Sequence, residues 1–235
     1  MVNDAVWPHD FPGGVADASG EHALYRDRQG RLVALRLDDG RMLWRSEASL
    51  RPLLIGAGLA LGLAAQPPRV VALALEGASA GQPAWISLPL PWPEWAAAAD
   101  TASVNLELEA AWLGKDLGLR WHLRRLYAGG ARPGPGQTGR EESTGACRID
   151  AVRGAMHPLQ QWPERADNKA PLDAVEDPQV LAQHRIGERH YQVVAHDAGS
   201  VRRTVLVAHD AAAGHLLWEH LIDEGARRSP APLRP

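Results

Sequence analysis

The sequence predicts an all-β fold made of repeated hairpin units, and two well-separated segments carry this prediction. Residues 31–44 (RLVALRLDDGRMLW) and 205–218 (VLVAHDAAAGHLLW) align without a gap. Identical residues in that alignment include Ala34 and Ala208, Gly40 and Gly214, Leu43 and Leu217, and Trp44 and Trp218. The composition supplies a third observation, because 45% of the 235 residues are hydrophobic and 23% are charged, as in an average globular domain. The chain is therefore expected to repeat one structural unit around a sizeable core.

Each unit is typical of a β-hairpin. The alternation around Leu32 and Ala34 suits a half-buried strand, because successive side chains of a strand point to opposite faces. Asp38 and Asp39 can cap backbone donors in the turn that follows, and Gly40 accepts a positive φ. The tryptophan on the returning strand is large and keeps a polar N–H, so we expect it at the seam between neighbouring sheets with its edge near water.

Weaker copies of the unit lie between the two good ones. Residues 70–85 (VVALALEGASAGQPAW) place Gly81 four positions before Trp85, and residues 146–158 (ACRIDAVRGAMHP) keep Asp150 and Gly154 at the offsets of Asp210 and Gly214. Pro158 stands there where tryptophan is expected. Between these copies, two alternating strands flank a turn at residues 114–116, with Trp121 on the return. The markers lie mostly 36–41 residues apart, near the ~40–45 residues of a four-stranded blade, so the prediction is a propeller-like array of roughly five blades, small or incompletely closed.

The domain prediction follows from where these units begin and end. Residues 1–20 are Gly-, Pro- and Asp-rich and are expected to be irregular, residues 21–226 to form the propeller-like domain, and residues 227–235 to form a flexible tail. Loops are expected near residues 131–143 and 162–180, where glycine, proline and charged residues gather. The apolar run at residues 53–65 is too short to span a bilayer and is expected to form two short strands around a turn.

The repeated frame A-x-D-x-x-x-G-x-x-x-W resembles the repeat of PQQ-type (quinoprotein) propellers. Ala208, Asp210, Gly214 and Trp218 match it, whereas Arg36 replaces the aspartate in the first unit. This resemblance implies a blade architecture in which tryptophans dock one blade against the next. It also implies two kinds of relative: quinone- and calcium-dependent dehydrogenases, and non-enzymatic propellers of outer-membrane assembly.

The departures from that family weigh against an enzyme. Such dehydrogenases are implied to have about eight blades, whereas 235 residues at ~40 per blade supply five or six. Many carry an adjacent Cys-Cys pair, but Cys147 is the chain's one cysteine. No set of Glu, Asn and Asp matches their calcium ligands. We therefore predict no catalytic residues, no cofactor and no metal.

Charge and cysteine usage bear on partners and compartment. The net charge of −3 and the scattered arginine pairs favour no nucleic-acid partner. A lone cysteine and the absence of a signal-like start suggest a cytoplasmic protein that does not insert into membranes. Other protein subunits are the expected partners, and a small-molecule ligand is left open.

Several residues are candidate sites beside a structural alternative. Six histidines lie between residues 184 and 220, and a turn at Gly187 and Glu188 favours solvent-facing hairpin positions over a metal site. Asp38, Asp39 and Asp150 are expected to cap turns. The segment at residues 89–95 (PLPWPEW) makes Trp92 and Trp95 either exposed partner anchors or plugs between blades. Arg125 and Arg132, beside Gly129 and Gly130, are weaker candidates for binding a partner or an anion.

Two functions from different classes remain. The first is a non-catalytic scaffold or accessory subunit that binds another protein on a rigid repeat surface. The alternative is a reduced quinoprotein or metal-dependent enzyme with its site near the propeller axis.

Overall fold

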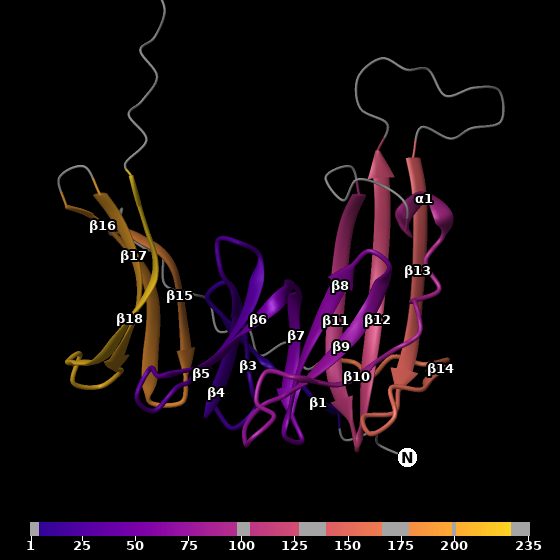
Figure 1. Cartoon of the computed structure of the whole chain (residues 1–235), viewed down its shortest axis with the longest axis horizontal. Helices are drawn as coiled ribbons and strands as arrows, with labels where there is room; N and C mark the ends of the chain where they lie inside the picture. Colours follow the sequence, from indigo (N-terminus) through magenta and orange to yellow (C-terminus); the bar gives the residue numbers. More distant parts are fainter. Residues whose placement is uncertain (1–4, 98–103, 127–139, 166–178, 199–200, 227–235) are drawn as a thin grey trace, which may run out of the picture.

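The computed structural model describes residues 5–97, 104–126, 140–165, 179–198 and 201–226, and within them it is all-β (Figure 1). Eighteen strands and one four-residue helix, α1 (Glu94–Ala97), make up these residues. The strands form four sheets in which every paired neighbour runs antiparallel. We number the sheets I to IV in the order in which their main strands occur along the chain.

Sheets I and II come from the first part of the chain. Sheet I has the strand order β2 (His9–Phe11), β3 (Gly14–Ala16), β4 (His22–Arg26), β5 (Arg31–Arg36) and β6 (Met42–Ser49). Sheet II has the order β7 (Arg51–Gly56), β8 (Leu59–Ala65), β9 (Pro68–Ala74) and β10 (Pro83–Ile86). The hairpins expected at residues 31–44 and 53–65 are both confirmed, because β5 and β6 pair and β7 and β8 pair.

Sheets III and IV come from the rest of the chain. Sheet III has the order β1 (Ala5–Val6), β11 (Val104–Leu113), β12 (Asp116–Leu126), β13 (Arg140–Ile149) and β14 (Met156–Pro158). Sheet IV has the order β15 (Val180–Ile186), β16 (Arg189–Ala198), β17 (Val201–Asp210) and β18 (Leu216–Ala226). The predicted turn at residues 114–116 joins β11 to β12, and the turn at Gly187 and Glu188 joins β15 to β16.

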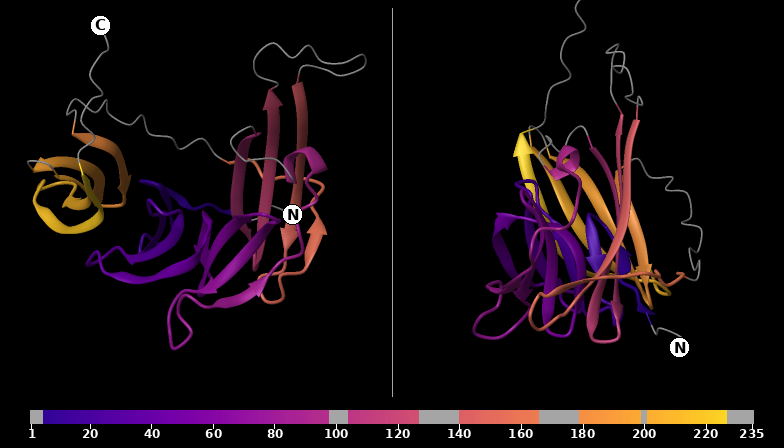
Figure 2. Two further views of the ribbon diagram at one scale, coloured as in Figure 1. Left: turned by 45° about the horizontal axis from the view of Figure 1, so that its top comes forward. Right: turned by 90° about the vertical axis from the view of Figure 1, so that its right-hand side faces the viewer.

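The sheets stand side by side in the order IV, I, II, III, so that the last sheet of the chain lies next to the first (Figures 1 and 2). Three buried clusters fill the three junctions. Leu206 and Tyr191 of sheet IV pack with Leu35 of sheet I. Leu24 and Leu32 of sheet I pack with Ile55 and Leu73 of sheet II. Leu54 and Leu61 of sheet II pack with Leu117, Leu119 and Leu123 of sheet III. Within the described chain, the outer side of sheet III and the outer side of sheet IV carry no further sheet.

Four sheets, rather than roughly five, account for the described residues. The difference arises in sheet III, where Trp121 lies on β12 and Pro158 ends β14, so that two markers counted as separate units belong to one sheet. Long strands cause this, because β11, β12 and β13 each run to ten or eleven residues. A sheet of longer strands uses up more of the chain than the ~40–45 residues of a typical blade.

The expectation that residues 1–20 are irregular is wrong for residues 5–16. Three short strands, β1 to β3, occupy this segment, and β1 pairs with β11 of sheet III while β2 and β3 belong to sheet I. Glycine and proline lie at the turns between these strands, where they suit tight connections. Residues 140–143, expected to belong to a loop, begin β13. Residues 127–139, 166–178 and 227–235, which hold most of the predicted loops and the predicted tail, lie outside the described residues.

No helix in the described residues is long and apolar enough to cross a membrane.

Candidate functional site

A recurring turn precedes the last strand of a sheet, and an aspartate organises it in sheets III and IV. Asp150 accepts hydrogen bonds through Oδ1 from the backbone N–H groups of Val152 and Arg153, each at 2.8 Å. The backbone N–H of Gly154 donates to the carbonyl of Asp150 at 2.8 Å, and its φ of 69° is one that glycine adopts without strain. The prediction that Asp150 caps a turn is confirmed. In sheet I, Asp39 accepts the N–H of Arg41 at 3.0 Å, which confirms the same role there.

Three tryptophans connect neighbouring sheets by lying on such turns. Trp44 of sheet I donates its Nε1–H to the carbonyl of Leu75 in sheet II at 2.8 Å, and Trp85 of sheet II donates to the carbonyl of Ala151 in sheet III at 2.6 Å. Trp218 of sheet IV donates to the carbonyl of Leu37 in sheet I at 3.0 Å. The expected position at the seam is therefore correct, but each N–H bonds to the neighbouring sheet's backbone rather than to water.

A glycine beneath each indole makes the close approach possible. A Cβ placed on Gly40 would lie 2.5 Å from the ring of Trp218, and one on Gly154 would lie 2.8 Å from the ring of Trp85. The corresponding distance from Gly81 to the ring of Trp44 is 3.1 Å. Contacts this short would force the ring away from the turn. We call a turn with this glycine and its carbonyl acceptor a docking turn.

A β-bulge aims each of these tryptophans at the next sheet. The strand register shifts between Leu35 and Ala34 opposite Trp44, and again between His209 and Ala208 opposite Trp218. A shift also separates Pro83 from Trp85 in β10. A bulge inserts one residue and so changes which face the following side chain joins. In sheet III the pairing of β13 with β14 continues through Pro158 without a shift, so this strand has neither the tryptophan nor the bulge.

The docking turn of sheet IV, Asp210–Gly214, is built like the others but holds no tryptophan of the described chain. Asp210 Oδ1 accepts the N–H groups of Ala212 (2.9 Å) and Ala213 (2.7 Å), and Gly214 has a φ of 69°. No described atom lies within 4 Å of a Cβ built on Gly214, and this glycine is exposed, whereas Gly40 and Gly154 are buried.

The residues of the predicted repeat thus gather at the sheet junctions. Those at junctions in the described residues are Ala34, Gly40, Trp44, Gly81, Trp85, Asp150, Gly154, Ala208 and Trp218, while Asp210 and Gly214 lie at the outer end of sheet IV. Sequence reasoning missed Trp112, which docks from sheet III onto the β7–β8 turn and donates to the carbonyl of Ile55 at 2.9 Å. The two glycines of that turn, Gly56 and Gly58, are the signal that could have indicated it.

No protein-family model matches the chain, and no curated protein matches it either.

The proposed aromatic anchors point inward. Trp92 and Trp95 are half-buried and pack against the cluster between sheets II and III, which is the arrangement expected of plugs between sheets. Arg125 lies on β12, and its Nη1 is 3.9 Å from Glu141 Oε2. Arg132, Gly129 and Gly130 lie outside the described residues.

The outer face of sheet III combines paired charged side chains with Trp162, which packs over Arg120 and against Gly118. Arg120 Nη2 lies 2.6 Å from Glu109 Oε2, and His122 Nδ1 lies 3.5 Å from Glu107. Further pairs join Arg124 to Glu107 and His122 to Glu142. Opposite charges facing each other across strands stabilise a solvated sheet face modestly. This end of the array therefore has the polar surface typical of a terminal repeat.

The outer side of sheet IV differs. Leu216 and Leu221 of its edge strand β18 are 53% and 50% exposed, and Leu216 pairs with His209 on this face, whereas Leu217 is the bulge residue between Leu216 and Trp218. Val194, Val205 and Val207 form a small buried cluster of their own on this sheet, with exposures of 9%, 1% and 6%. Val205 pairs directly with Leu221, so the two side chains share a face. On this face sheet IV thus exposes leucines, whereas sheet III carries ion pairs.

The histidines of sheet IV fall on both of its faces. His190 and His209 are cross-strand neighbours, whereas His220 faces sheet I and lies 3.1 Å from the hydroxyl of Tyr25. Burial lowers the pKa of His220, and the nearby Arg45 guanidinium lowers it further. Burial likewise lowers the pKa of His184 and of His190. These residues serve pairing and packing rather than converging on one point.

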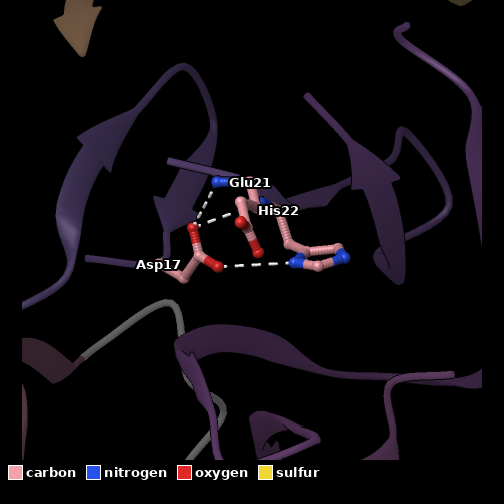
Figure 3. Close-up of side chains that lie close together, drawn as sticks. All are labelled: Asp17, Glu21 and His22. Atoms are coloured by element: carbon pink, nitrogen blue, oxygen red, sulfur yellow. Dashed lines mark hydrogen bonds and ion pairs between the residues drawn. The ribbon is translucent and has the colours of Figure 1, made fainter. Parts of the chain in front are cut away.

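One group of potential metal ligands, Asp17, Glu21 and His22, lies at the β3–β4 turn (Figure 3). Asp17 Oδ1 accepts the backbone N–H of Glu21 (2.8 Å) and of His22 (3.1 Å), and its Oδ2 lies 3.0 Å from the Ser19 hydroxyl and 3.4 Å from His22 Nδ1. The carboxylate thus already has partners on both oxygens. The arrangement is that of an aspartate capping a turn.

A cleft of about 500 Å³ lies among sheets I, II and III and includes Arg26, Arg51 and Trp7 in its lining. Arg26 donates to the Gly30 carbonyl and the Ser49 hydroxyl, and Arg51 donates to the Leu106 carbonyl. Asp10 and Glu109 line the same cleft. The mixture of both charges gives the cleft no single preference for an anion or a cation.

Proposed function

We propose that this chain is a non-catalytic scaffold, an incomplete propeller of four blades that binds another protein through the outer side of sheet IV. The repeat, with its resemblance to PQQ-type propellers, supports the blade-like arrangement. The contrast between the two ends of the array carries the proposal. Sheet III carries ion pairs on its outer face, with Trp162 packed over Arg120, whereas β18 of sheet IV exposes Leu216 and Leu221 along a free edge.

Physical chemistry favours a partner at the sheet IV end. An exposed edge strand offers unpaired backbone groups and is a ready template for another strand. Apolar side chains grouped on such an edge gain free energy when a partner removes them from water. The partner is expected to be a protein with an apolar surface that carries at least one edge strand.

The experiment compares two charge substitutions. Leu216→Glu combined with Leu221→Glu places carboxylates on the outer side of β18, and Leu88→Glu is the control because Leu88 is 71% exposed on the sheet II side. Proteins that cross-link to the wild-type chain in its native cell are identified, and each is then purified and titrated. A partner bound through sheet IV should lose affinity by about tenfold or more with the double variant, and should be unaffected by Leu88→Glu. Equal binding of all three proteins would contradict the proposal.

The alternative, a reduced quinoprotein or metal-dependent enzyme, stays a prediction. Its test is incubation with PQQ and calcium, followed by gel filtration and an assay of dye-linked alcohol or sugar oxidation. Retention of the quinone with turnover would support the enzyme over the scaffold.

A further inference from the structure

The occupied docking turns of sheets I and II share two parts besides the glycine. The residue that accepts the indole N–H is itself held by its own N–H: Leu37 donates to the carbonyl of Glu21 at 2.8 Å, and Leu75 donates to the carbonyl of Gly58 at 2.9 Å. Its carbonyl oxygen accepts the indole N–H: the distance from Trp218 Nε1 to the Leu37 oxygen is 3.0 Å, and that from Trp44 Nε1 to the Leu75 oxygen is 2.8 Å. Together these parts fix the acceptor before a tryptophan arrives.

The Asp210–Gly214 turn has the same parts in place. Ala211 stands three residues before Gly214, as Leu37 stands before Gly40 and Ala151 before Gly154. The N–H of Ala211 donates to the carbonyl of Glu188 at 2.8 Å, which repeats the bond made by Leu37. The N–H of Gly214 donates to the carbonyl of Asp210 at 2.9 Å, as Gly154 does to Asp150. The turn is therefore organised in advance as an acceptor.

The chain has no tryptophan left to fill this turn. All nine tryptophans lie within the described residues. Trp44, Trp85 and Trp218 occupy the other docking turns, and Trp7 packs edge-on against Trp162 at a centroid distance of 5.7 Å. The remaining four pack into or against the cluster between sheets II and III: Trp92, Trp95, Trp112 and Trp121. Among the described residues, no hydrogen bond to the carbonyl of Ala211 is found.

We propose that the Asp210–Gly214 turn is a vacant docking turn that receives a tryptophan from an edge strand of a partner protein. The indole N–H would donate to the carbonyl of Ala211, and the ring would lie over Gly214. This inference rests on the proposed scaffold function and names the chemistry of the partner: a β-sheet whose last strand carries a tryptophan after a bulge.

Continuity with the three internal junctions supports this occupant. Each internal junction combines a docked indole with an apolar cluster, and the outer side of sheet IV offers both the turn and the exposed side chains of Leu216 and Leu221. A second copy of this chain is a poor donor. Its free sheet at the other end, sheet III, has Pro158 in place of tryptophan, no bulge at that position, and a charged outer face.

The direct test uses the full-length ¹⁵N-labelled chain and a defined probe. The probe is a synthetic peptide with the sequence of residues 80–89 (AGQPAWISLP), which carries Trp85, and the matched control peptide replaces that tryptophan with alanine. Short peptides bind such a turn weakly, so titration to on the order of millimolar concentration is appropriate. We expect saturable shifts of the Ala211 to Gly214 amide resonances with the tryptophan peptide alone. Absence of these shifts, or equal shifts with the alanine peptide, would overturn the proposal.

A variant makes the test more specific. Gly214→Ala adds a Cβ into open space, so the fold tolerates it apart from the positive φ, yet the methyl group occupies the position that an indole needs. We expect the peptide-induced shifts at the Asp210–Gly214 turn to be lost in this variant. Retained shifts would argue against docking over Gly214. If the variant does not fold, the pair of peptides on the wild-type chain still decides the question.

The two proposals can fail separately. A native partner that loses affinity with the Leu216 and Leu221 substitutions but binds Gly214→Ala normally would support the scaffold and overturn the tryptophan acceptor. Peptide binding at the turn, without any native partner that depends on sheet IV, would support the acceptor and overturn the scaffold.

Discussion

Glycine at a docking turn has two separate reasons to be there, and the four turns allow these reasons to be separated. Gly40 and Gly214 have the same φ of 69°, so both impose the same backbone strain on any other residue. Of these two glycines, only Gly40 lies under an indole. The cost of a methyl group should therefore differ between the two sites by the cost of displacing that ring.

Gly40→Ala is predicted to destabilise the protein much more than Gly214→Ala. A left-handed conformation costs a non-glycine residue about 1–2 kcal/mol, and this applies to both variants. Overpacking against the Trp218 ring adds about 1–3 kcal/mol for Gly40→Ala alone. The free energies of unfolding from urea denaturation give the comparison. Equal losses would mean that the indole does not depend on the space above Gly40.

Cys147 supplies a second prediction at this scale. The thiol is buried in the cluster between sheets II and III, and burial raises its pKa to about 12. Because the thiolate is the reactive form, the native protein should react with a disulfide reagent such as DTNB far more slowly than the same protein in denaturant. Fast labelling of the folded chain would indicate that this junction opens readily.

At the scale of the sheets, sheets III and IV each have one neighbouring sheet in the described chain, and the junction of sheet IV contains a histidine. The contact of sheet IV with sheet I includes the bond between Tyr25 and His220, at 3.1 Å. Burial lowers the pKa of His220 below its ordinary value of 6.5, so the unfolded chain binds the proton more readily than the folded chain does. This stabilisation is complete above pH 6.5 and is lost as the pH falls toward the lowered pKa of the folded state.

Acidification is accordingly predicted to loosen sheet IV before the other sheets. Hydrogen exchange at about pH 7.5 and about pH 5.5, corrected for the intrinsic rates, should show a selective loss of protection in β16 to β18. His220→Gln should reduce the effect, and His157→Gln, on the exposed strand β14, is the matched control. Uniform loss of protection in all four sheets would contradict a local origin at His220.

The sequence predicted these sheets wherever a turn left a clear mark. The hairpins around Gly40 and Gly214 and the aspartate at position 150 were identified because glycine and aspartate act locally, within four or five residues. The number of sheets could not be predicted in the same way, because Trp121 looks the same in sequence whether it faces a junction turn or the interior. Its indole nitrogen is buried without a hydrogen-bond partner, unlike that of Trp44.

The candidate site shows the same limit. The four docking turns could be aligned from sequence, but which of them is vacant depends on the order of the sheets in space. That order places sheet IV beside sheet I and leaves the outer side of sheet IV uncovered by the rest of the described chain (Figure 2). Trp92 and Trp95 could not be assigned to surface or interior, because a tryptophan–proline segment suits both. Long-range packing decides such matters.

For the whole molecule, the unlike ends of the array predict the oligomeric state. Head-to-tail association requires a tryptophan donor at one end and an acceptor at the other, and sheet III supplies no donor. The purified chain should therefore have the mass of a single chain by light scattering at micromolar concentrations. A concentration-dependent series of oligomers that persists in Gly214→Ala would show that another surface mediates association.

The order of the sheets also has a consequence for how the protein is made. Trp44 and Trp85 dock onto residues 31 and 66 positions away, but Trp218 reaches back 181 positions to Leu37. At roughly 5–20 residues per second, a ribosome needs on the order of ten to forty seconds to synthesise that interval. During this time the face of sheet I that carries Phe11, Tyr25 and Leu35 has no covering sheet. The nascent chain thus exposes an apolar sheet face through most of its synthesis. A chaperone that shields apolar strands is most needed before residue 218 leaves the ribosome.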